Sequence, residues 1–207
     1  MKKITPYFLF FAMAAGAANA QQAPTILGLR GGLTLSSYTG DVNAVEYKKG
    51  FHVGVIFKLP VTKLLAVQPE VLYSMKGAQG NETSNGYSFS YDETLHYVNV
   101  PVLAKITTDQ GLFFEAGPQL GVLVAARGEG KAAGPYGSKT ASGNIKPEFN
   151  DLEMGYVVGL GFQLPDNPLL LGVRYNGGFT NIAKDYGDKS VRNSAFQFYL
   201  GVLFGNK

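Results

Sequence analysis

The chain has 207 residues, with 18 Lys and Arg against 15 Asp and Glu, and a net charge of +3. This near balance argues against nucleic acid as a partner, because nucleic-acid binding depends on an excess of basic residues. The complete absence of cysteine excludes disulfides and thiolate metal sites.

The first twenty residues have the pattern of an export signal. Two lysines precede a short apolar stretch (7–18) that cannot span a bilayer, and a small-x-small cleavage pattern follows it. We therefore predict a signal peptide at residues 1–20 and one mature domain at residues 21–207. An uncleaved N-terminal anchor is the alternative. Loss of Lys2 and Lys3 leaves 16 basic and 15 acidic residues, a net charge of +1.

Residues 112–125 show the most regular pattern of the mature chain. Alternate residues form a nearly all-apolar face, while the other face mixes polar residues, glycine and a charge. A period of two with one apolar face predicts a β-strand. The apolar face comprises Leu112, Phe114, Ala116, Pro118, Leu120, Val122 and Val124, and the mixed face comprises Phe113, Glu115, Gly117, Gln119, Gly121, Leu123 and Ala125.

Eight segments alternate in this way, and the chain has little else from which to build a soluble core. The simplest solution places the apolar faces against lipid and the polar faces in a lumen. We therefore predict an all-β fold, an eight-stranded antiparallel up-and-down transmembrane β-barrel. The predicted strands lie at about 25–36, 51–59, 65–76, 94–106, 112–125, 152–164, 169–180 and 195–204.

The connections between these strands alternate in length, as in outer-membrane barrels with long outer loops and short periplasmic turns. Both termini are then periplasmic. Tyr and Phe residues at the two ends of the strands are typical of aromatic belts. The long connections are 37–50, 77–93, 127–151 and 181–194, and the short ones are 60–64, 107–111 and 165–168.

Two of the long connections carry further signals. In the segment 80–91, Tyr87, Phe89 and Tyr91 alternate, which predicts that the hairpin continues above the membrane. Such an extension also offers an edge to which a partner strand could add. The Gly/Ala/Lys/Ser-rich segment 127–144 is predicted to be a mobile loop.

Three prolines fall inside predicted strands, where each removes a ladder hydrogen bond, and we expect bulges to accommodate them. The segments that contain them are Gln68–Tyr73 (QPEVLY), Tyr97–Lys105 (YVNVPVLAK) and Glu115–Gly121 (EAGPQLG). They resemble the porin-like outer-membrane β-barrel family common in Bacteroidota, which is similar in size and topology to the small OmpA/OmpX-type barrels.

This resemblance implies an eight-stranded barrel in the outer membrane, but it implies little about activity. We expect such a protein to contact outer-membrane lipids, lipopolysaccharide and the barrel-assembly machinery. One departure concerns the last residues. Many such barrels end on an aromatic residue, whereas here Phe204 is followed by Gly205, Asn206 and Lys207.

Charged residues on the inward faces are the main candidate site. An eight-stranded barrel has an interior that side chains just fill, and an unpaired charge there is costly. We predict an internal ion-pair network that plugs the lumen; a polar path for protons or small solutes is the alternative. The network residues are Arg30, Lys58, Glu70, Lys105, Glu115, Glu153 and Arg174, with Lys76 also facing inward.

Catalytic and metal sites have weaker support. His52 and His96 are the only histidines, and both are predicted near the outer rim, where a lipid-modifying barrel enzyme would need one. No base with an orienting partner is apparent, so we predict no catalytic residue. The loop carboxylates are scattered and form no Asp-x-Asp-x-Asp-Gly motif, so we predict no metal or cofactor.

The sequence therefore predicts a monomeric, non-enzymatic outer-membrane protein with a structural or surface-interaction role. An extracellular ligand is expected at the loops 77–93 and 127–151, and no nucleic acid is expected as a partner. A narrow porin-like channel, a lipid-modifying barrel enzyme and a soluble lipocalin-like carrier are the alternatives. The carrier is disfavoured because it would place Gly, Arg and Glu outside and crowd its cavity with Leu, Val, Phe and Tyr.

Overall fold

The computed structural model describes residues 25–41, 46–84, 86–135, 137–184 and 189–204, so the predicted signal peptide lies outside the described residues. No helix in these ranges combines the length and apolar character needed to cross a bilayer. The elements are β1 (Ile26–Gly40), β2 (Glu46–Pro60), β3 (Leu65–Ser84), β4 (Tyr87–Thr107), β5 (Leu112–Gly134), β6 (Gly137–Asn144), the 3-10 turn η2 (Lys146–Glu148), β7 (Leu152–Gln163), β8 (Leu169–Gly178) and β9 (Val191–Phe204).

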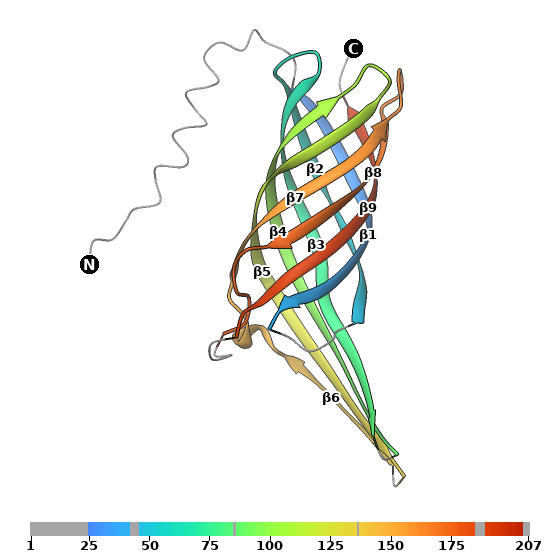
Figure 1. The fold of residues 1–207 in the computed structure, drawn as a ribbon, viewed down its shortest axis with the longest axis vertical. Coiled ribbons are helices and arrows are strands. Elements are labelled where there is room, and N and C mark those ends of the chain that lie inside the picture. Colours follow the sequence, from blue (N-terminus) through green and yellow to red (C-terminus); the bar gives the residue numbers. More distant parts are fainter. Residues whose placement is uncertain (1–24, 42–45, 85, 136, 185–188, 205–207) are drawn as a thin grey trace, which may run out of the picture.

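The strands form one antiparallel sheet that closes on itself (Figure 1). Its order is β4-β3-β2-β1-β9-β8-β7-β5-β6, and a further pairing of β4 with β5 completes a ring of eight strands. β6 stays outside the ring, and within the described residues its strand partner is the outer half of β5. The predicted eight-stranded up-and-down barrel is confirmed. Closure pairs the backbone of every ring strand on both sides, which a bilayer requires.

The two faces of the barrel wall differ as the alternation predicts. Large apolar side chains cover the outside, and Leu33 and Leu200 are 66% and 69% exposed. Charged side chains point inward, and Glu70 and Arg174 are only 0% and 1% exposed. This inside-out distribution of polarity suits a barrel with lipid around it.

Aromatic rings group on the outer surface near the ends of the strands that lead into the long connections. Phe51 lies beside Tyr73, with ring centroids 5.8 Å apart, and Tyr73 stacks on His96 at 5.9 Å. On the other side of the barrel, Tyr175 contacts Tyr156 at 6.0 Å and Phe196 at 5.1 Å. These groups mark the outer rim of the apolar band.

Beyond this rim, β3, β4, β5 and β6 continue together and project past the other strands (Figure 1). We call their extensions (77–84, 87–95, 126–134 and 137–144) the outer sheet. The predicted continuation of the hairpin through 80–91 is confirmed. The predicted mobile loop at 127–144 is wrong, because β5 and β6 pair without a break from Arg127↔Asn144 to Gly134↔Gly137. That segment lacks alternating hydrophobic residues, so its pairing with β4 and within the hairpin was not visible in the sequence.

The predicted bulges at the three prolines are also wrong. The register is the same on both sides of Pro69, Pro101 and Pro118. The N–H of each strand residue points to only one of the two neighbouring strands. A proline therefore removes one ladder hydrogen bond but inserts no extra residue, and the register does not shift. The shifts in register occur elsewhere, between Tyr47 and His52 and between His96 and Tyr97.

The second of these shifts changes which β5 side chains point inward. His96 pairs with Ala125 while Tyr97 pairs with Leu123, so Val124 is the extra residue of a bulge. Ala125 was expected on the inward face but is exposed, and Ala126 is buried instead. The alternation resumes from Ala126 with its phase changed by one residue.

Candidate functional site

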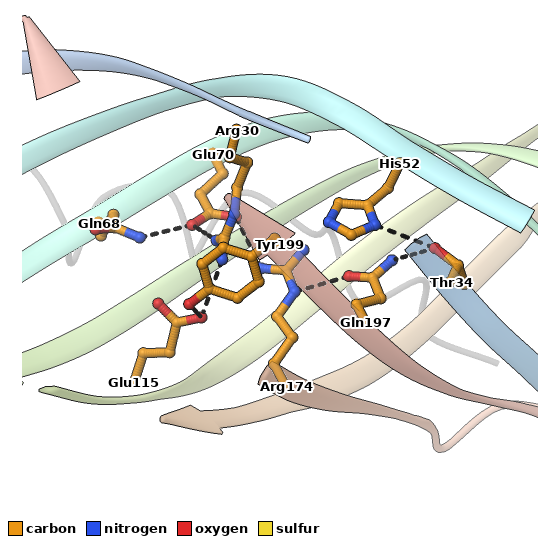
Figure 2. Close-up of polar contacts among 9 residues, drawn as sticks. All are labelled: Arg30, Thr34, His52, Gln68, Glu70, Glu115, Arg174, Gln197 and Tyr199. Carbon is orange, nitrogen blue, oxygen red and sulfur yellow. Dashed lines mark hydrogen bonds and ion pairs between the residues drawn. The ribbon is translucent and has the colours of Figure 1, made fainter. Parts of the chain in front are cut away.

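The centre of the lumen contains a carboxylate held between two guanidinium groups (Figure 2). This carboxylate belongs to Glu70 on β3. Arg30 Nη1 donates to Glu70 Oε1 at 2.5 Å, and Arg174 Nη1 donates to Glu70 Oε2 at 2.9 Å. Gln68 donates a third bond to Oε1 at 2.6 Å. All of these side chains are buried, so the charges are compensated within the barrel rather than by bulk solvent.

A second carboxylate, Glu115 on β5, joins the same group (Figure 2). Its Oε1 accepts the Tyr199 hydroxyl at 2.9 Å and lies 3.4 Å from Arg30 Nη2. Arg30 Cζ also lies 3.5 Å from the centroid of the Tyr199 ring. Two cations and two carboxylates therefore neutralise each other here, and we call Arg30, Glu70, Glu115, Arg174 and Tyr199 the central cluster.

Neutral side chains extend the central cluster toward the outer end. Arg174 Nε donates to Gln197 Oε1 at 2.7 Å, and Gln197 Nε2 lies 3.4 Å from Thr34 Oγ1. Thr34 Oγ1 lies 3.1 Å from His52 Nδ1 (Figure 2). His52, predicted near the rim, is thus a buried member of this lumen network rather than an accessible catalytic group.

A separate group lies nearer the outer mouth. Glu153 Oε2 accepts Lys76 Nζ at 3.3 Å and Asn193 Nδ2 at 3.0 Å. The same amide lies 3.2 Å from the Tyr97 hydroxyl, and Lys76 Nζ lies 5.0 Å from the centroid of the Tyr97 ring. Glu153 therefore pairs with Lys76 and makes no direct ion pair with the central cluster.

The remaining predicted network residues, Lys58 and Lys105, make different contacts. Lys58 is partly exposed near the short-turn end and donates to Gln163 Oε1 at 3.3 Å. Lys105 is buried with its Nζ 3.6 Å from the centroid of the Phe113 ring. Within the described ranges, neither ammonium group lies within ion-pair distance of a carboxylate.

Apolar clusters occupy both ends of the lumen, and the alternation along single strands does not predict them. At the short-turn end, Ile56, Phe113, Leu170 and Leu203 pack beside Tyr199. At the outer mouth, residues from the long connections pack onto the strands in a group we call the outer cap. The outer cap consists of Tyr38, Ala78, Leu95, Tyr97, Leu123, Ala126, Phe149, Ile182 and Val191, with Ile145 and Ala183 against it.

Backbone bonds hold the cap segments in place. Asn150 N donates to Ile182 O at 2.7 Å, and Ile182 N donates to Val191 O at 2.8 Å. The sequence indicates this arrangement only through isolated apolar residues, such as Phe149 and Ile182, in otherwise polar connections. These residues can be buried only once the closed barrel provides a mouth for them to fill.

Just outside the rim, the Tyr38 hydroxyl donates to Glu93 Oε2 at 2.9 Å. Burial, together with the nearby charges of Glu148 and Asp92, raises the pKa of Glu93 above its usual 4.5, although the bond from Tyr38 opposes this shift. Burial and the Glu93 charge also raise the pKa of Tyr38 well above 10.0. Asp92 pairs with Lys48 on the same side of the barrel.

The other candidate groups do not form a reactive arrangement. His96 lies on the outer surface with Nδ1 2.6 Å from the Tyr73 hydroxyl. In the parts of the chain that the structure describes, no three His, Cys, Asp or Glu side chains are grouped to hold a metal ion. Asp185 and Asp188, two of the loop carboxylates, lie outside the described residues.

Comparison with solved structures identifies small outer-membrane proteins of similar size. The chain is similar to Ail, the attachment invasion locus protein of Yersinia pestis, with 14% identity over 88% of this chain and 100% of that chain and a TM-score of 0.49. It is also similar to Neisserial surface protein A, with 13% identity over 85% of this chain and 96% of that chain and a TM-score of 0.47. It is similar as well to OprG of Pseudomonas aeruginosa, with 10% identity over 89% of this chain and 98% of that chain and a TM-score of 0.41.

No curated protein matches the sequence. The family model described as outer membrane protein beta-barrel domain matches residues 19–184, which is most of the chain. This match agrees with the closed ring of eight strands and with its apolar outer surface. The chain therefore belongs to the family of outer-membrane β-barrel proteins.

Proposed function

We propose that this protein is a monomeric, non-enzymatic outer-membrane barrel whose lumen is closed and whose function resides in its extracellular part. The observation that carries this proposal is the filling of the lumen in successive layers. An apolar cluster lies at each end, and the central cluster of two arginines and two glutamates lies between them. An ion entering the barrel would have to displace both the apolar side chains and the internal ion pairs.

We also propose how the protein reaches the outer membrane. Residues 1–20 direct export, and the barrel-assembly machinery inserts residues 21–207 among outer-membrane lipids and lipopolysaccharide. The three proline-containing segments support the narrower assignment to the porin-like barrels of Bacteroidota. They lie on the neighbouring strands β3, β4 and β5, which carry Glu70, Lys105 and Glu115.

A narrow channel is the second candidate, and one observation favours it. Several buried lumen atoms, among them His52 Nε2, Arg174 Nη2 and Glu115 Oε2, have no hydrogen-bond partner within the described part of the chain. Buried polar atoms need partners, and water in a hydrated path would supply them. No comparable observation favours a lipid-modifying enzyme, because among the described residues His52 and His96 contact the hydroxyl groups of Thr34 and Tyr73 rather than an orienting carboxylate.

Single-channel conductance in planar bilayers tests the closed lumen. We expect refolded wild-type protein to show no steady conductance, and Glu115→Ala and Arg174→Ala to show leak, because each removes one member of the central cluster. Val158→Ala, a lipid-facing substitution on β7, is the matched control and should remain closed. Steady wild-type conductance would overturn the proposal and identify the inward charges as a selectivity filter.

A further inference from the structure

The outer sheet has two chemically different faces. On one face the ladder places Gly80, Tyr91, Gly130 and Ala141 in one row across β3, β4, β5 and β6. The next row is Glu82, Phe89, Ala132 and Lys139; at the tip, Ser84 pairs with Tyr87 and Gly134 pairs with Gly137. The opposite face presents mainly Ser, Thr and charged side chains, including Ser88, Ser90, Asp92, Lys131 and Thr140.

The three aromatic residues Tyr87, Phe89 and Tyr91 therefore form a stripe along β4, with glycine and alanine on the β5 side and Gly80, Glu82 and Ser84 on the β3 side. A Cβ added to Gly134 would lie 2.6 Å from the Tyr87 ring, and one added to Gly80 would lie 2.5 Å from the Tyr91 ring. The Tyr87 and Tyr91 rings therefore cover the backbone of Gly134 and Gly80, respectively. A ring with one face on a sheet turns its other face outward, and Tyr87 and Phe89 remain 58% and 51% exposed.

The stripe also borders an open hollow of about 780 Å³. Its lining includes Glu82, Ser84, Phe89, Ala132, Gly134 and Lys139 from this face, together with Thr83, Ser88, Ala133 and Ser138 from the opposite face. In the second row, Glu82 is next to Phe89, and Lys139 follows beyond Ala132. Since strands are spaced by about 4.8 Å, the backbones of Glu82 and Lys139 lie roughly 14 Å apart.

We propose that this face binds a neutral polysaccharide chain of flat, equatorially substituted hexopyranose units, a step that rests on the surface role proposed above. The apolar C–H face of such a sugar stacks on an exposed aromatic ring, while its hydroxyl rim hydrogen-bonds to polar side chains at the edge. The aromatic stripe supplies the first interaction, and Ser84, Glu82 and Lys139 supply the second. The opposite charges of Glu82 and Lys139 balance, so an uncharged ligand is favoured over a polyanion.

Two observations favour a free glycan over other occupants. The stripe continues the inward side of β4, since Tyr87, Phe89 and Tyr91 share their strand face with Leu95 and Tyr97 inside the barrel. It therefore faces the space above the barrel mouth, away from the lipopolysaccharide that surrounds the wall. An apolar polypeptide is disfavoured, because the apolar part of the face is one ring wide and is bordered by glycine, alanine and charge.

Binding of cellohexaose to the refolded mature protein in lipid nanodiscs, measured by calorimetry, tests this proposal. We expect wild-type binding, about tenfold weaker binding in Phe89→Ala, and restored binding in Phe89→Trp. We also expect weaker binding in Gly134→Ala, which displaces the Tyr87 ring without removing it. Thr140→Ala is the matched control, because Thr140 is exposed on the opposite face of the outer sheet, and its affinity should equal that of wild type.

Several outcomes would overturn the proposal. One is no cellohexaose binding by wild type, or equal affinity in wild type, Phe89→Ala and Gly134→Ala while circular dichroism shows all three folded. Another is binding of unfolded α-casein in place of the sugar, which would identify a polypeptide partner. Binding of dextran sulfate alone, lost in about 0.5 M NaCl, would identify a charge-driven site. Conductance depends on the lumen, whereas sugar binding depends on the outer sheet. Failure of sugar binding is therefore distinguishable from failure of the closed-lumen proposal.

Discussion

The guanidinium of Arg30 lies over the Tyr199 ring, 3.5 Å from its centroid, while the Tyr199 hydroxyl donates to Glu115. One aromatic side chain therefore contacts both a cation and an anion of the central cluster. Tyr199→Phe should cost about 1 kcal/mol by removing the hydrogen bond, and Tyr199→Leu about 2–3 kcal/mol by removing the ring face as well. Urea unfolding in lipid vesicles, followed by circular dichroism, measures both. Equal stability of the two variants would show that the ring face contributes nothing.

Replacement of Glu70 by Gln tests the importance of the buried charge. The substitution leaves Arg30 and Arg174 facing each other without the carboxylate that both contact. Removing one partner of a buried charged group typically costs about 3–5 kcal/mol. Glu129→Gln, an exposed change on the outer sheet, is the control and should alter stability by less than about 0.5 kcal/mol. Equal unfolding midpoints for the two variants would contradict the expectation.

Glu93 should make the outer mouth sensitive to pH. Its pKa in the folded protein is raised above 4.5, so the folded state holds this proton more tightly than the unfolded state. The stabilising contribution is therefore full below pH 4.5 and is lost as pH rises through the raised value. Glu93→Gln should retain a bond from Tyr38, stabilise the mouth at neutral pH and flatten this dependence. Hydrogen exchange between pH 4 and 8 measures it, and an unchanged slope in Glu93→Gln would assign the effect to another group.

The outer cap should depend on its two buried connection residues. Phe149→Ala or Ile182→Ala removes apolar contacts at the mouth, at a cost of about 2–5 kcal/mol for that region. We expect faster hydrogen exchange at the amides of Asn150 and Ile182, with little change in the barrel strands. Phe179→Ala is the control, since Phe179 is 62% exposed outside the cap. Unchanged exchange at both amides would show that the cap does not order the connections.

The signal peptide can be tested from the mass of the exported protein. Protein recovered from an outer-membrane fraction should begin near Gln21. Substitution of the small residues of the cleavage pattern, as in Ala18→Leu with Ala20→Leu, should leave a precursor that is about 2 kDa heavier. Intact-mass spectrometry distinguishes these products. Membrane-inserted wild-type protein that still begins at Met1 would support the alternative of an N-terminal anchor.

Alternation along each strand was sufficient to predict the barrel and the inward direction of Arg30, Glu70 and Arg174. Alternation is a local property, because successive side chains on a strand point to opposite faces. It failed at Ala125, where the bulge at Val124 changes the phase, since a bulge depends on how two strands pair. It also gave no sign of β6, whose small residues pair with β5 without an apolar pattern of their own.

The amino-acid sequence alone thus determined the strand pattern, the apolar outer surface and the set of charges that face inward, because these follow from the order of residues within single strands. Only the tertiary structure decided which charges meet. Arg174 and Glu70 are 104 residues apart, and the register of the closed ring brings them together. The same closure created the mouth that Phe149 and Ile182 fill. It also let four strands continue beyond the rim, where Tyr87 and Phe89 form an exposed stripe.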